Sequence, residues 1–144
     1  MEFEGEYLNG QRNGIGKEYD GYNDILIFEG EYLNGKRNGK GKEYNCYNGK
    51  LEFEGEYLNG ERNGKGKEYY DNGKLKFEGE YLYGDKLKGK LYINDKLEYE
   101  GEYINGKRHG NGKEYNCKTG DLLFEGEYIN DNRLSGKKYN KNNN

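Results

Sequence analysis

The sequence predicts an all-β protein, built as an elongated single-layer twisted sheet of about six stacked antiparallel β-hairpins with no helix of note. Three observations support this fold class. A block of the form aromatic-Glu-Gly-Glu-Tyr recurs six times along the chain. Apolar and charged residues alternate within each block, which is the period of a strand with one packed face. Asn-Gly, a dipeptide that favours tight hairpin turns, follows the block in four of the six units.

The composition requires that order come from aromatic packing. Only 31% of the 144 residues are hydrophobic, 35% are charged, and the mean hydropathy is -1.42, values that are common in disordered chains. The chain nevertheless holds 17 Tyr, 5 Phe and 25 Gly with no Pro. Aromatic residues favour strands and glycine favours tight turns, so the composition supports a sheet whose core is made of rings.

Charge and cysteine content narrow the function classes. No stretch of the chain is apolar for long enough to span a bilayer, and no run after basic residues resembles a signal peptide. Two thiols, Cys46 and Cys117, are too few for a disulfide framework. A formal net charge of -3 gives no general attraction to nucleic acid. We therefore expect a cytoplasmic protein that does not bind nucleic acid, with association with membranes or the cytoskeleton left open.

The repeat defines the expected domain organisation. Counting from the aromatic residue of each block as position zero, Gly stands at position +2 and Tyr at position +4 in every unit. The zero positions are Phe3, Phe28, Phe53, Phe77, Tyr99 and Phe124. We expect one array of six repeats over residues 1–139, with units that start near residues 1, 26, 51, 75, 97 and 122. Residues 140–144, rich in Asn, are expected to form a disordered tail.

Glycine and aromatic residues alternate on the same face of the first strand of each unit. A residue without a Cβ atom leaves a slot into which a ring from a neighbouring unit can lie, and this slot replaces aliphatic filling. An odd number of residues in the hairpin loop would place Tyr19 beside Phe3, whereas an even number would place Gly14 and Gly16 there, because a shift of one residue exchanges the faces. We favour the odd loop, which gathers the rings on one side.

The run Phe28-Glu-Gly-Glu-Tyr-Leu-Asn-Gly-Lys-Arg-Asn-Gly-Lys-Gly-Lys-Glu-Tyr44 resembles the MORN (membrane occupation and recognition nexus) repeat, which has the same aromatic-x-Gly-x-aromatic, Gly and Gly-x-Gly spacing. The run His109-Gly110-Asn111-Gly112 is closest to the usual His-Gly-x-Gly of that family. The fourth and sixth units are one residue shorter and lose the paired glycines, so the pattern does not define their hairpin tips. The resemblance implies a scaffold or adaptor that binds protein partners, self-associates or, in some members, contacts acidic phospholipids.

A basic residue at position +9, close to the hairpin tip, recurs in every unit and should form a row with members about 10 Å apart. The row comprises Arg12, Arg37, Arg62, Lys86, Arg108 and Arg133. Each cation could contribute about 1 kcal/mol at an anionic leaflet. The six cations together would give weak, salt-sensitive docking to a membrane. The competing interpretation is a set of solvated turn charges that pair with Glu of the same or the next unit, and the overall acidity of the chain favours it.

The aromatic face is the main candidate for a partner site. Its rings could form the only core available to a single sheet, or they could line a groove for an extended or helical peptide. A mixture of the two is the third alternative. The candidate partner-binding residues are Phe28, Tyr32, Phe53, Tyr57, Phe77, Tyr81, Tyr99 and Tyr103. Glutamates at positions +1 and +3 are expected to pair with Lys of the second strand, as ordinary cross-strand charge matching rather than as calcium sites.

The sequence predicts no catalytic or metal-binding set and no cofactor. His109 is the only histidine, and it has no partner with which to form a zinc site or a general base. We therefore expect a non-catalytic scaffold that binds a protein or peptide. The alternative is a peripheral module that binds acidic phospholipids or phosphoinositides through the basic row. Because the chain opens in phase with a repeat, its first unit should leave an open edge, and a homodimer through this uncapped unit is a further expectation.

Overall fold

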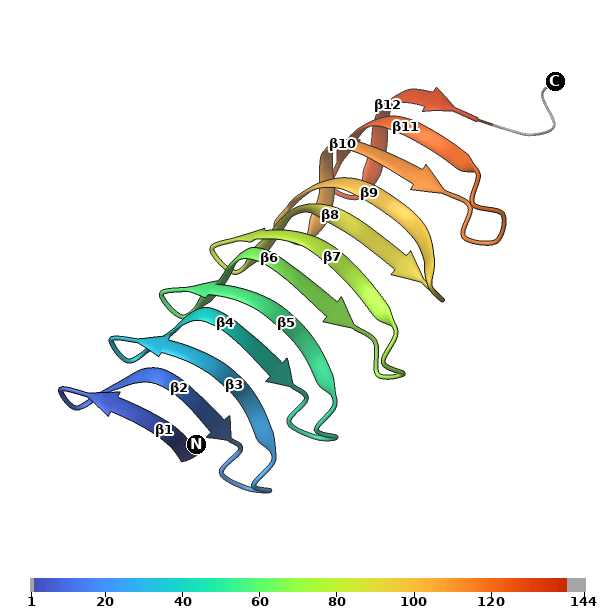
Figure 1. The fold of residues 1–144 in the computed structure, drawn as a ribbon. Coiled ribbons are helices and arrows are strands. Elements are labelled where there is room, and N and C mark those ends of the chain that lie inside the picture. Colours follow the sequence, from blue (N-terminus) through green and yellow to red (C-terminus); the bar gives the residue numbers. More distant parts are fainter. Residues whose placement is uncertain (1, 140–144) are drawn as a thin grey trace.

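The computed structural model describes residues 2–139, and the predicted tail at residues 140–144 lies outside them. Within these residues, twelve strands follow one another and pair in sequence order into one antiparallel sheet. Figure 1 shows the hairpins stacked in a single row, with β1 and β12 at opposite ends of the row. Residues 2–139 contain no helix, so the predicted fold class is confirmed. The strands are β1 (Glu2–Leu8), β2 (Gln11–Tyr19), β3 (Leu26–Leu33), β4 (Lys36–Tyr44), β5 (Leu51–Leu58), β6 (Glu61–Tyr69), β7 (Leu75–Leu82), β8 (Asp85–Ile93), β9 (Lys96–Ile104), β10 (Lys107–Tyr115), β11 (Leu122–Ile129) and β12 (Asn132–Lys138).

Each unit is a hairpin closed by a two-residue turn whose backbone is left-handed at both positions, the conformation that matches the twist of the flanking strands. In the first unit the turn residues are Asn9, with a φ of 51°, and Gly10, with a φ of 77°. The fourth and sixth units close in the same way through residues 83–84 and 130–131. The loss of Asn-Gly in these two units therefore does not open their hairpin tips.

The hairpin register differs from the predicted one. Phe3 lies opposite Glu18 rather than Tyr19. A tight turn is followed by a bulge that gives β2 two more residues than β1 between the turn and the glycine pair Gly5–Gly16. The offset is therefore even, and the tyrosine at position +16 lies on the opposite face from the rings at positions 0 and +4. The preference for an odd loop was wrong, because the pairing of bare backbone with bare backbone fixes the register instead of the gathering of every ring on one side.

The core is a continuous row of edge-to-face aromatic contacts, here called the ring row. The ring centroid of Phe28 lies 5.6 Å from that of Tyr32 in the same strand and 5.2 Å from that of Tyr57 in the next unit. The same two kinds of contact continue along all six units, with centroid separations from 5.0 to 5.8 Å. Edge-to-face pairs contribute about 0.5–1.5 kcal/mol beyond the burial of their area. The ring row therefore joins each hairpin to its neighbours and serves as the core that a second layer would otherwise supply.

Glycines at positions +2 and +13 let the rings lie directly against the backbone. Gly30 and Gly41 face each other across β3 and β4. A Cβ atom built on Gly41 would lie 2.5 Å from the ring of Phe28 and 3.0 Å from the ring of Tyr57. The predicted slot is therefore present, and the ring closest to it comes from the same hairpin, with the ring of the neighbouring hairpin slightly farther away.

Gly41→Ala should destabilise the protein by about 1–3 kcal/mol, because the added methyl group has no room between two buried rings. The free energy of unfolding, measured by urea denaturation with near-ultraviolet circular dichroism, tests this. The matched control is Lys40→Ala, an exposed neighbour, which should change the free energy of unfolding by less than about 0.5 kcal/mol. Equal stability of the two variants would contradict the role given to the bare backbone.

Candidate functional site

A layer of cations covers the ring row. The guanidinium carbon of Arg37 lies 4.0 Å from the ring centroid of Phe28, and that of Arg62 lies 4.0 Å from Phe53. The residue at position +9 takes the same place in the other units, at 4.3 to 4.7 Å. The register explains this placement, because it pairs Arg37 with Tyr32 of the preceding strand and so directs both side chains to the aromatic face. A cation over a ring contributes about 0.5–2 kcal/mol, depending on its desolvation.

Glutamate at position +15 joins consecutive units. Glu18 accepts a hydrogen bond from the hydroxyl of Tyr32 at 2.5 Å and another from the guanidinium of Arg37 at 2.9 Å, both in the next unit. Burial is the largest single influence and raises the pKa of Glu18, but the bonds from Arg37 and Tyr32 and the charges of Arg37 and Arg12 together outweigh it. The pKa of Glu18 is therefore lower than the ordinary value of 4.5, and the carboxylate is ionised at neutral pH although the residue is only 4% exposed. Burial, together with the bond to Glu18, raises the pKa of Tyr32.

Cations and carboxylates alternate along the aromatic face, in a series that we call the ionic ladder. Arg37 lies 2.9 Å from Glu18 and 3.4 Å from Glu43. Arg62 continues the series by pairing with Glu43 and Glu68. The ladder runs through Arg12, Glu18, Arg37, Glu43, Arg62, Glu68 and Lys86, and, after a gap, through Arg108, Glu114 and Arg133.

Leu91 causes the gap in the ionic ladder. It occupies the place between the fourth and fifth units where a ladder glutamate stands between other units, and it packs against the ring row. The hydroxyl of Tyr103, a residue that is 6% exposed, consequently has no hydrogen-bond partner in the described part of the chain. The hydroxyls of Tyr57 and Tyr81 also lack a hydrogen bond of good geometry. Burial is the main reason that the pKa of each tyrosine is raised, and a nearby ladder carboxylate raises it further.

The ring row and the ionic ladder decide where two sets of predicted site residues lie. The rings predicted to contact a partner are only 0 to 6% exposed and form the core of the array. These rings are Phe28, Tyr32, Phe53, Tyr57, Phe77, Tyr81, Tyr99 and Tyr103. Each basic residue predicted to contact lipid has a carboxylate within 4 Å, which supports the competing interpretation of paired charges. These residues are Arg12, Arg37, Arg62, Lys86, Arg108 and Arg133.

The opposite face of the sheet is hollowed into a trough, lined by residues between Ile15 and Glu80 of strands β2 to β7, with a volume of about 910 Å³. Its floor is the peptide backbone at the glycine pairs, such as Gly30 and Gly41, and its sides carry glutamates from first strands and lysines from second strands. The trough therefore crosses the strands. Sequence reasoning missed it, because the alternating Glu and Lys were interpreted only as charge matching. The signal was the alternation itself: a Cβ atom at the glycine positions would point to the aromatic face, which leaves a strip of bare backbone between two charged rows on the other face.

Three glutamates of the trough, Glu29, Glu54 and Glu56, are held by hydrogen bonds from the protein itself. Glu29 accepts a bond from the hydroxyl of Tyr44 at 2.5 Å, and burial followed by this bond raises the pKa of Tyr44 to about 12. Glu56 folds back over the bulge at Gly64 and accepts a bond from the backbone N–H of Lys65 at 2.6 Å. These carboxylates therefore stay close to the sheet.

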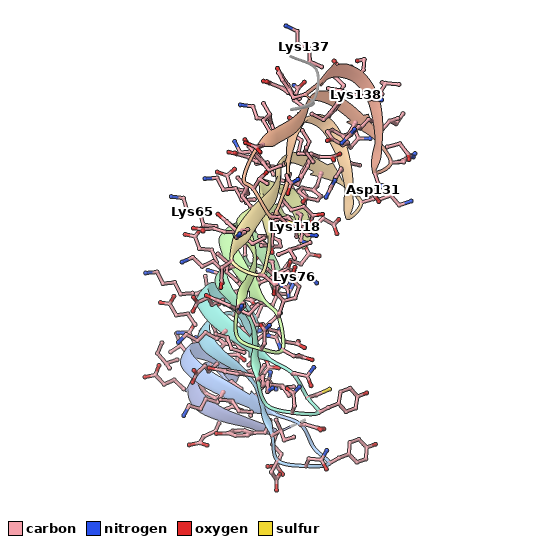
Figure 2. All side chains as sticks on the ribbon, turned by 90° about the vertical axis from the view of Figure 1, so that its right-hand side faces the viewer. Lys65, Lys76, Lys118, Asp131, Lys137 and Lys138 are labelled. Atoms are coloured by element: carbon pink, nitrogen blue, oxygen red, sulfur yellow. The ribbon has the colours of Figure 1, made fainter. Side chains whose placement is uncertain are left out.

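The lysines of the trough are free by comparison. Lys17, Lys42 and Lys67 occupy position +14 of three consecutive units and are exposed. Within residues 2–139, none of the three has a carboxylate within 4 Å of its ammonium group. Figure 2 shows another trough lysine, Lys65, extending away from the ribbon, whereas Lys118 lies at the loop end of the hairpins that faces the viewer. The trough therefore offers ammonium groups without an ion pair, beside exposed carboxylates such as those of Glu56 and Glu78.

Other kinds of site were sought in the same residues. Residues 2–139 contain no cluster of His, Cys, Asp and Glu that could hold a metal ion. The same range has no helix with the length and apolarity needed to cross a membrane. Cys46, which is exposed, and Cys117, which is partly buried, are free thiols.

The stacked hairpins, the ring row and the glycine-floored trough define the class of the protein as an open β-hairpin repeat array. The family model of the MORN repeat matches residues 3–21, 28–45, 53–74 and 99–117, which is more than half of the chain. The protein therefore belongs to the MORN-repeat family. A search of curated proteins gave no match.

The family model recognises four MORN repeats where the sequence pattern predicted six. The two units that it omits begin near Phe77 and Phe124, and they form hairpins like the others. Their bulge has one residue fewer, so the glycine that marks position +11 in the other units is missing. Six was therefore two too many as a count of MORN repeats.

The ionic ladder should make stability depend on pH. The pKa of Glu18 is lowered in the folded protein, and so is that of Glu114, chiefly by its hydrogen bond from Arg133. A carboxyl whose pKa is lower in the folded protein binds its proton more readily in the unfolded chain. Its contribution to stability is therefore present above the unfolded-state pKa, and it is lost as the pH falls through the folded-state pKa. We expect the free energy of unfolding to decrease as the pH falls below about 4.5.

Urea denaturation at a series of pH values measures this decrease. The double variant Glu18→Gln/Glu114→Gln should be less stable than the wild type at pH 7 and should lose less stability on acidification. Glu61→Gln, which changes an exposed carboxyl near a hairpin turn, is the control and should keep the wild-type pH dependence. The same pH dependence in all three proteins would show that the ladder carboxyls do not carry the effect.

Proposed function

We propose that this protein is a non-catalytic platform that binds a protein or peptide partner in the trough. The observation that carries the proposal is the hollow across six strands, with exposed ammonium groups beside bare backbone. The aromatic face offers no comparable surface, because the ionic ladder covers its buried rings. Membership of the MORN-repeat family agrees with this function, since MORN repeats are known in protein-binding and membrane-associated proteins.

The shape of the trough suits an elongated ligand. The floor is bare backbone, because side chains at its positions would point to the aromatic face, and so the backbone of a ligand can approach the sheet closely. Clefts that combine apolar floor with a few placed polar groups are the usual form of a binding site, and here both are repeated along the array. A partner with a repeated or extended surface would meet the same set of groups in each unit.

Binding to acidic phospholipids has less support. A lipid headgroup would have to draw a cation out of the ionic ladder, which would uncover a ring and leave a ladder carboxylate such as Glu18 without its partner. An unpaired buried charge costs several kcal/mol, more than the roughly 1 kcal/mol that a cation gains at an anionic leaflet. Recovery of the protein together with acidic vesicles in a flotation assay at physiological salt would favour the membrane alternative.

The proposed function can be tested with the tagged protein as bait in a lysate of its native cell. The amount of each partner protein retained by the bait should decrease at least about fivefold in the trough variant Lys42→Glu/Lys67→Glu, because two contacts become repulsive. The control Lys36→Glu/Lys50→Glu makes the same change of charge at exposed positions outside the trough. Quantitative mass spectrometry compares the three baits. Equal retention of every protein by the trough variant and the control would refute the proposed function.

We also propose that the first hairpin is a self-association edge. Tyr7 is 60% exposed, whereas the equivalent tyrosines of the other five units are 2 to 6% exposed. Within residues 2–139, β1 forms one edge of the sheet, and the ring contact of Tyr7 is with Phe3 of its own strand. Exposed edge strands pair with other chains unless they are protected.

Sedimentation velocity over a range of micromolar concentrations tests this self-association. The wild type should show a dimer whose fraction rises with concentration, and Tyr7→Lys should reduce that fraction by removing the exposed ring. Tyr22→Lys, which alters a loop tyrosine that is 96% exposed, should leave the fraction unchanged. A monomer at every concentration would remove the proposal.

A further inference from the structure

The repeat fixes the distance between equivalent side chains in the trough. Lys17, Lys42 and Lys67 lie on β2, β4 and β6, so each is two strands from the next. Neighbouring strands are about 4.8 Å apart, and the three lysines therefore recur about every 9.6 Å along the trough. A ligand that uses all three must present equivalent groups at this interval on one of its faces.

Among regular polypeptide conformations, polyproline II has this period. It has three residues per turn and a rise of about 3.1 Å, so every third side chain returns to the same face after about 9.3 Å. Three residues of an extended β-strand cover about 10 Å. Successive side chains of a strand alternate between its faces, so residues i and i+3 point to opposite faces. An α-helix returns a side chain to nearly the same face after seven residues, or about 10.5 Å.

The distance between the outer lysines separates the two remaining candidates. Lys17 and Lys67 lie four strand spacings apart, or about 19.2 Å. Six residues of polyproline II cover about 18.6 Å, whereas fourteen residues of an α-helix cover about 21 Å. Polyproline II therefore matches the three lysines more closely than a helix does.

The state of the charged groups selects the sign of the ligand. A carboxylate that approaches Lys17, Lys42 or Lys67 displaces no ion pair, since none has a carboxylate within 4 Å in the described residues. A cationic ligand would instead have to compete with the groups that already bond to the glutamates, such as the hydroxyl of Tyr44 on Glu29. Glu29 and Glu54, which alternate with the three lysines across the strands, each accept a tyrosine O–H bond, so the groups left without a partner favour an acidic segment.

We infer that the trough binds an acidic segment in the polyproline II conformation, which lies across the strands and presents a carboxylate to Lys17, Lys42 and Lys67 at every third residue. This inference rests on the proposed function, because it names the class of partner for the same trough. Such a segment brings a preformed, low-entropy conformation, so little ordering opposes its binding.

Two peptides of identical composition test the inference with the full chain. The first probe is fluorescein-labelled (Glu-Pro-Pro)6, and the second is (Glu-Glu-Pro-Pro-Pro-Pro)3, which has the same charge and polyproline II content but the wrong spacing. Fluorescence polarisation at physiological salt should show that the first peptide binds at least about fivefold more tightly, because only it can contact all three lysines. Its affinity should decrease with added salt.

A triple variant and a matched control complete the experiment. Lys17→Gln/Lys42→Gln/Lys67→Gln should weaken binding of (Glu-Pro-Pro)6 at least about fivefold. Lys36→Gln/Lys50→Gln/Lys118→Gln removes the same charge at exposed positions outside the trough and should leave the affinity unchanged. Circular dichroism confirms that both variants fold.

Several outcomes would overturn the inference. Equal affinity for the two peptides, or equal weakening by the two triple variants, would reduce the binding to a general attraction between charges. Absence of peptide binding, while the bait experiment still recovers a partner that depends on Lys42 and Lys67, would reject the polyproline II ligand and leave the proposed function intact. Absence of both kinds of binding would reject the two together.

Discussion

Close contact between aromatic rings and bare glycine backbone is the constraint on which the rest of the structure depends. A single sheet has no second layer against which to bury apolar surface, so the rings must find cover within the sheet itself. Glycine at positions +2 and +13 provides that cover from below, as the space around Gly41 and Phe28 shows. The upper surface of each ring is then closed by an arginine or lysine, and the glutamates of the ionic ladder hold these cations in place. Ring, cation and carboxylate therefore form one layered core that is repeated along the array.

The sequence was sufficient to predict the fold because its periodicity is local. Alternation of period two, Asn-Gly turns and a repeat near 25 residues each depend on neighbours within one hairpin, and they gave the order and the antiparallel pairing of the strands correctly. The register was not fully predictable in the same way. The two-residue turn pairs Tyr32 with Arg37, and a bulge then adds two residues to β4, which keeps the faces but sets which glycines meet. The bulge includes the left-handed Gly39, and beside it Glu31 accepts a hydrogen bond from the backbone N–H of Lys40. A pattern of residue types does not show this cross-strand bond.

The face that was predicted to meet a partner is the one that the fold covers. An odd offset would have directed the arginines to the other face of the sheet and left the rings uncovered. The observed even offset places Arg37 over the ring of Phe28, where its guanidinium donates a hydrogen bond to Glu18. Residues that were predicted to meet a partner became the core, and the charged residues of the other face became the sides of the trough. Burial cannot be deduced from amphipathic alternation alone when both faces of a strand carry charges.

The orientation of the strands has a mechanical consequence. Because the chain crosses the array in every strand, the backbone hydrogen bonds between hairpins run along the long axis, and β1 and β12 lie at opposite ends of the row. Tension applied between these ends therefore loads one strand pair at a time, starting at the outer hairpins, rather than shearing many bonds together. The array should peel apart stepwise and close again in the reverse order, and the gap left by Leu91 in the ionic ladder marks a junction with fewer ionic contacts to separate.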